Sequence, residues 1–219
     1  MNIEGHWDEE LHGLDYVVYA YLQKADDKKA FEQLQYLRSI TRVFPINFKE
    51  AYAFAAMPTR YALERKDWGA AMKLELQPSD FPWEQFPWER ANISFGRLLG
   101  AVNSNKLAEA KVELKDLQLS HEKLTEAKDP YKANLVLIQI KSAEGWIKLL
   151  EGQREEAIIR MTDAAEMEEA TAKHPVTPGE VIPARELLGD MYLAMNEPAK
   201  ALGAYEADLK SHPNRFNGL

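Results

Sequence analysis

The stretch VIPARELLGDMYLAMNEPAKALGAYEADLKSHP, residues 181–213, shows most clearly how this chain is built. Apolar and small residues recur in it at helical spacing on both sides of residues 196–198. Pro198 suits the first turn of a new helix, because that position needs no backbone N–H donor. The stretch therefore predicts two helices joined by a short turn.

The same stretch has a spacing that resembles the tetratricopeptide repeat, namely L-G-x2-Y, then A-x3-aromatic and a closing proline, at Leu188, Gly189, Tyr192, Ala201, Tyr205 and Pro213. Small residues at Gly189 and Ala201 allow two antiparallel helices to approach closely, while the tyrosines fill the groove between them. Two departures from the repeat are Arg185 at its usual Trp position and Asp208 at its second small position. An ordinary helical hairpin is the alternative.

Composition limits the fold and the partners. Leucine, alanine, glutamate and lysine are abundant in the 219 residues and alternating β-branched runs are nearly absent, which indicates an all-α protein. The formal net charge of −8 argues against nucleic acid as a partner, because phosphates need a basic surface. The chain has no cysteine for disulfides and no 18-residue apolar run for membrane insertion. A cytoplasmic location is the default expectation, and a periplasmic one remains open if a signal was removed.

The helical pattern of residues 181–213, which serve as the template for the other pairs, recurs along the whole chain. An alanine opens each expected second helix, at Ala30, Ala71, Ala110, Ala157 and Ala201. These alanines lie 39 to 47 residues apart, against about 34 in a pure tetratricopeptide array. The sequence therefore predicts one domain over residues 1–219, an α-α superhelix of about five lengthened antiparallel helix pairs, at residues 10–40, 47–77, 88–128, 130–172 and 181–213.

Two connectors between the pairs are rich in proline. Phe-Pro-Trp-Glu occurs twice within residues 77–90, at 81–84 and 86–89, and prolines forbid a continuous helix there. Its rings are expected to fill the gap between neighbouring helix pairs, and an aromatic ligand clamp is the alternative. The second connector, KHPVTPGEVIP at residues 173–183, is expected to be stiff.

Four strings together resemble a group of longer bacterial tetratricopeptide-repeat proteins: HPVTPGEVIPARELLGDMYL, FPWEQFPWE, RYALERKDW and HPNRFNGL. That group carries no activity that can be transferred. The resemblance implies the superhelical fold and a chain that is a portion of a longer array. An uncapped last pair would expose apolar area, so a homodimer through the terminal helix pair is a further expectation.

In such arrays the first helix of each pair lines the concave surface, where ligands usually lie. Transferring the register of the template to every pair predicts these inward positions: His12, Asp15, Tyr19, Arg60, Glu64, Asn92, Phe95, Asn103, Gln139, Ser142, Trp146, Glu186 and Asp190. The set mixes rings, amides and both charges, which suits a protein or peptide partner better than an apolar cofactor. For any one of them, a merely solvated or mutually paired side chain is the alternative.

The leading hypothesis is therefore a protein–protein interaction or scaffold module that needs no cofactor. The alternative is a small-molecule binder or enzyme with a site near His12, Asp15 and Arg60, because His12 and Asp15 share a helical face. No HExxH, GxSxG or phosphate-binding glycine loop is present, and the five histidines lack metal-ligand spacing. No catalytic or metal-binding residue is predicted.

Overall fold

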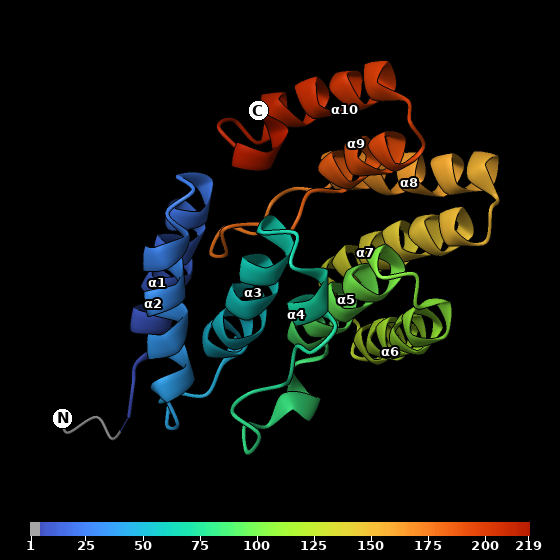
Figure 1. Ribbon diagram of the computed structural model, residues 1–219. Coiled ribbons are helices and arrows are strands. Elements are labelled where there is room, and N and C mark those ends of the chain that lie inside the picture. Colours follow the sequence, from blue (N-terminus) through green and yellow to red (C-terminus); the bar gives the residue numbers. More distant parts are fainter. Residues whose placement is uncertain (1–4) are drawn as a thin grey trace.

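The computed structural model describes residues 5–219, and within them it is all-helical, with no β-strand (Figure 1). Ten α-helices and two short 3-10 turns follow one another: α1 (Asp8–Gln23), α2 (Asp27–Ser39), α3 (Phe48–Glu64), α4 (Trp68–Ala71), η1 (Trp83–Gln85), α5 (Pro87–Asn103), α6 (Leu107–Glu126), α7 (Pro130–Leu150), α8 (Arg154–Glu169), α9 (Ala184–Ala194), α10 (Pro198–Ser211) and η2 (Phe216–Gly218). The predicted all-α class and the pairing of adjacent helices are confirmed.

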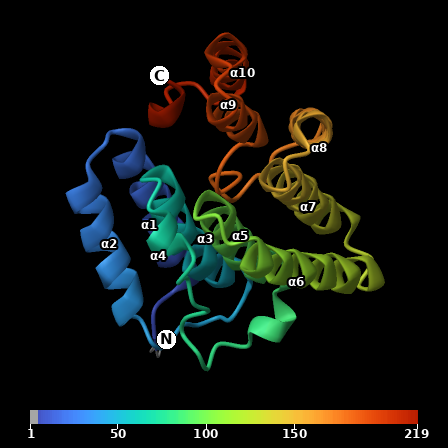
Figure 2. The ribbon, with the colours of Figure 1, turned by 45° about the vertical axis from the view of Figure 1, so that its right-hand side comes forward.

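The helix pairs form a curved row. The first helices pack against one another in the order α1, α3, α5, α7 and α9. The second helices α2, α6, α8 and α10 lie toward the outside of the curve, so the first helices form its inner surface (Figure 2). In the described residues no helix is long and apolar enough to cross a membrane.

The same local devices recur in the five pairs. The five alanines that open the second helices are at most 1% exposed, as the close approach of two helices requires. Each pair turns through a residue with positive φ, at Ala25, Lys66, Asn105, Gly152 and Asn196. A Cβ atom added to Gly189 would lie 2.5 Å from the ring of Tyr205, which confirms the predicted close contact between α9 and α10.

The second pair departs from the expected pattern, because α4 is only one helical turn long. After α4 the guanidinium of Arg97 donates to the carbonyl of Leu74, which takes that carbonyl out of any continuing helix. The proline-rich connector then folds its rings into the core, where Phe81 and Trp83 are buried and Phe81 packs on Phe54. Beside the shortened helix a cavity of ≈ 720 Å³ remains, lined by Leu34, Tyr61 and Leu74 among others.

Candidate functional site

The inner surface of the curve is covered by the chain itself. Residues 171–183, here called the inner segment, connect α8 to α9 without helix and lie against the first helices. Side chains of α1, α3 and α7 donate to its main-chain carbonyls: Tyr16 to Val176 at 3.1 Å, Tyr131 to Ala172 at 2.9 Å, Arg60 to Gly179 at 3.4 Å, and Tyr52 also to Gly179. The inner surface thus binds an extended polypeptide mainly through its backbone.

One side chain of the inner segment is inserted between aromatic rings. The His174 ring lies 5.5 Å from Phe48, 5.6 Å from Trp88 and 5.9 Å from Tyr131, measured between ring centroids. Burial and the nearby ammonium of Lys132 lower the pKa of His174, so the uncharged imidazole is favoured. We call the three surrounding rings the ring site.

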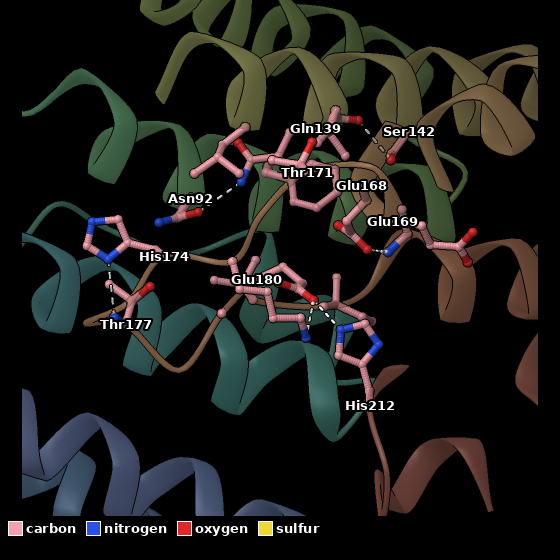
Figure 3. Close-up of a pocket in the computed structure, with 18 of the residues that line it drawn as sticks. Asn92, Gln139, Ser142, Glu168, Glu169, Thr171, His174, Thr177, Glu180 and His212 are labelled. Carbon is pink, nitrogen blue, oxygen red and sulfur yellow. Dashed lines mark hydrogen bonds and ion pairs between the residues drawn. The ribbon is translucent and has the colours of Figure 1, made fainter. Parts of the chain in front are cut away.

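A cavity of ≈ 230 Å³ remains between the inner segment and helices α3, α5, α7 and α8. Asn92 of α5 and Gln139 of α7 line it, and the amide of Gln139 donates to Oδ1 of Asn92 at 2.8 Å (Figure 3). Nδ2 of Asn92 and Oε1 of Gln139 have no hydrogen-bond partner among the described residues, although both side chains are buried. The pair therefore holds one unpaired donor and one unpaired acceptor, both shielded from solvent beside the cavity.

Charged groups close the other end of the cavity. His212 lies between two carboxylates, with Nδ1 2.8 Å from Asp208 and Nε2 facing Glu180 (Figure 3). Burial lowers the pKa of His212, but the hydrogen bonds to Asp208 and Glu180 outweigh it and raise the pKa to about 9. Glu168 accepts from the backbone N–H of Ala184 at 2.7 Å, and burial together with Glu180 raises its pKa well above the usual value. The positive charge of the His212 imidazolium thus offsets much of the negative charge of Asp208 and Glu180.

Four of the predicted inward residues come together in this cavity, namely Asn92, Phe95, Gln139 and Ser142. The Ser142 hydroxyl donates to the carbonyl of Ile138 at 3.0 Å within α7. Phe95 is buried and contributes an apolar wall. Two predicted residues of α5 and two of α7 thus line the same cavity.

In the predicted cluster of His12, Asp15 and Arg60, the structure pairs Asp15 with Arg60. Asp15 accepts from Arg60 at 2.6 Å, and both side chains are buried. Burial raises the pKa of Asp15 more than Arg60 lowers it. His12 packs edge-on against Tyr16, with ring centroids 5.2 Å apart, while Tyr19 lies 5.5 Å from the Arg60 guanidinium. Arg60, not His12, is the hydrogen-bond partner of Asp15.

Glu64 of α3 and Glu186 of α9 meet through an arginine from the end of the described chain. Arg215 donates to Glu64 at 2.7 Å and to Glu186 at 2.6 Å, and all three side chains are at most 3% exposed. Burial raises the pKa of Glu186 to about 7, although Arg215 acts in the opposite direction. The cluster connects the second helix pair to the fifth.

Three predicted residues lie apart from the cavity and from each other's contacts. Asn103 donates to the carbonyl of Leu99 at the end of α5, at 2.8 Å. Trp146 is buried in the core. Asp190 binds Lys66 and the hydroxyl of Tyr205, at 2.8 and 2.7 Å. The bond of Asn103 stays within α5, Trp146 belongs to the hydrophobic core, and Asp190 joins α9 to Lys66 and to α10.

Four residues that close the site, and Arg215 of the neighbouring ion cluster, were not predicted from the sequence: His174, Thr177, Glu180 and His212 line the cavity. Only the unusual string HPVTPGEVIP, with three prolines in ten residues, drew attention to the inner segment. No local pattern showed that this connector crosses the inner surface, because its partners lie up to 160 residues away in sequence.

Comparison with known proteins adds no functional assignment. No protein-family model matches the chain, and neither a curated protein nor a solved structure does so.

Proposed function

We propose that this chain is a tetratricopeptide-like interaction module whose inner surface binds a segment of a partner protein by its backbone. The observation that carries the proposal is the buried amide pair of Asn92 and Gln139 beside the ≈ 230 Å³ cavity. Nδ2 of Asn92 and Oε1 of Gln139 are unpaired and shielded from solvent, and a rotation of the two amides that turns them into the cavity would match them to the C=O and N–H of a peptide group. A polypeptide backbone therefore suits this site better than an apolar ligand does.

The energetics favour a ligand that pairs with both atoms. A buried polar group without a partner costs about 1–3 kcal/mol, and a net hydrogen bond contributes about 0.5–1.5 kcal/mol. The apolar walls of the cavity come from Trp88, Phe95 and Leu135, and they would cover the side chains on either side of the bound peptide group. Such a site gives modest affinity and tolerates different sequences.

The inner segment supports this mode of binding. Three tyrosines and one arginine of the first helices already donate to its carbonyls. Donors of this kind recognise any residue type, because they contact the main chain. The same surface can therefore bind an extended segment of another protein without a strict sequence match.

The experiment compares Gln139→Met with the wild type on an immobilised array of short peptides of varied sequence. Methionine keeps the length and removes both the carbonyl acceptor and the N–H donor that binds Asn92, so bound peptides should lose affinity by about threefold to tenfold, the equivalent of one hydrogen bond to the ligand. Gln35→Met on the exposed side of α2 is the matched control and should leave binding unchanged. Equal peptide binding by the wild type and folded Gln139→Met would disprove the proposal.

A further inference from the structure

The inner segment makes only one insertion of a side chain between rings of the first helices. Most of its hydrogen bonds to the first helices join their side chains to the carbonyls of Ala172, Val176 and Gly179, and one joins the side chains of Asn134 and Thr171. The His174 ring is held by Phe48, Trp88 and Tyr131. The ring site is thus the aromatic contact of the inner segment, and the side chains of Val181 and Ile182 are buried in the core farther along it.

The ring site makes no demand that the guest be histidine. Nδ1 of His174 accepts from the backbone N–H groups of Val176 and Thr177, at 3.2 and 3.4 Å, so its ring nitrogen is satisfied inside the inner segment. The helices offer ring faces and edges only, in the tilted and edge-on arrangements that aromatic pairs prefer. A phenyl or phenol ring can make the same contacts.

Charge at the rim of the ring site selects against a cation. The ammonium of Lys132 lies 5.2 Å from the Trp88 ring and 5.6 Å from the Phe48 ring, where it already occupies their negative faces. Its carboxylate partner Glu89 is fully buried and 3.5 Å away. A second positive charge in the ring site would be repelled by Lys132, so an uncharged ring is the preferred guest.

The part of the inner segment around His174 has hydrogen bonds from Tyr131 and Tyr16, but it is more exposed than the end next to α9. Glu180 binds His212 and Lys173, and Ala184 is tied to Glu168, so the segment is firmly fixed near α9. Around His174, residues 172, 173 and 175 are exposed and no regular secondary structure is formed. Local opening of such a stretch costs less than opening of a helix.

We propose that the inner segment is a displaceable occupant, and that the ring site receives an uncharged aromatic side chain from an extended partner segment when His174 leaves. This inference rests on the proposed function and names the anchor of the partner. A tethered occupant competes at an effective concentration on the order of millimolar. Weakening the occupant therefore strengthens the binding of the partner.

The probe is a synthetic peptide with the sequence of residues 171–183 carrying His174→Phe, and its binding is followed by calorimetry and tryptophan fluorescence. The folded variant His174→Ala should bind it at least tenfold more tightly than the wild type. The variant His174→Phe, which fills its own ring site better, should bind it more weakly than the wild type. His121→Ala, on the outer helix α6, is the matched control and should behave as the wild type.

A second peptide carries His174→Lys and should bind none of these proteins measurably, because Lys132 repels it. The inference is overturned if the probe binds His174→Ala and the wild type equally, or if the lysine peptide binds as well as the phenylalanine peptide. If His174→Ala does not fold, the affinities of the wild type and His174→Phe for the probe are compared instead, and binding by His174→Phe that is no weaker than that of the wild type overturns the inference. Array peptides that depend on Gln139 but not on residue 174 would disprove the displacement while leaving the proposed function intact.

Discussion

Replacing Arg60 by methionine tests whether the buried pair with Asp15 holds the first two helix pairs together. The substitution removes the partner of a carboxylate that is only 2% exposed, and leaves an unpaired charge in the core. Breaking such a pair from one side costs about 3–5 kcal/mol, a large part of the roughly 5–15 kcal/mol that stabilises a typical domain. The carbonyl of Gly179 keeps its bond from Tyr52, so it adds little to the cost.

The double variant Asp15→Leu/Arg60→Met removes both charges, and its free energy of unfolding should lie within about 1 kcal/mol of that of the wild type, because no buried ion remains uncompensated. Urea unfolding followed by tryptophan fluorescence measures all three free energies of unfolding. A single variant that costs less than about 1 kcal/mol, or a double variant no more stable than the single one, would refute the reasoning.

The same free energies of unfolding can be compared at different pH values. Without Arg60 the pKa of Asp15 rises further, because the group that lowered it is gone. The folded single variant then binds more protons than its unfolded chain above the ordinary pKa of Asp, so its stability falls as the pH rises. The deficit relative to the wild type should therefore be larger at pH 7 than at about pH 5.

Two further predictions concern the last helix pair. Gly189→Ala should destabilise the protein by about 1–3 kcal/mol, because its Cβ would meet the Tyr205 ring, whose hydroxyl is bound to Asp190. Gly203 lies on the exposed side of α10 with open space at its Cβ. Gly203→Ala should therefore stabilise the protein by about 0.5–1 kcal/mol in the same unfolding assay. His212→Gln should lower the free energy of unfolding by roughly 2–4 kcal/mol near pH 6, and this difference should disappear as the pH rises through about 9. The reason is that a histidine whose pKa is raised on folding stabilises the protein fully below its unfolded pKa and no longer does so above its folded pKa. A difference that does not change with pH would contradict the prediction.

The repeated parts of the fold were predictable from the sequence, because they depend on short-range patterns. The buried alanines at the start of each second helix and the contact of Gly189 with Tyr205 both follow from helical spacing and side-chain size. The single-turn α4 was less visible, since Gly69-Ala70-Ala71-Met72 has the same helical pattern as the longer helices. Its end depends on Arg97, which comes from the next pair.

The site was predictable only where one helix face decides it. Asn92 and Gln139 were placed on the inner side by periodicity, but their mutual hydrogen bond joins residues 47 apart in sequence. Arg215 and Glu64 are 151 residues apart, and an arginine near a chain end carries no sign of a buried partner. The route of the inner segment across the first helices depends on such distant contacts as well.

The cluster of Arg215 with Glu64 and Glu186 has a mechanical consequence. In an ordinary helical array each unit contacts only its neighbours, so the array stretches like a spring and frays from its ends. Here the ion cluster closes the curve into a loop, because Arg215 links α3 to α9 across the inner surface. The fifth pair cannot peel away without opening a contact to the second, which makes the two halves of the curve unfold together.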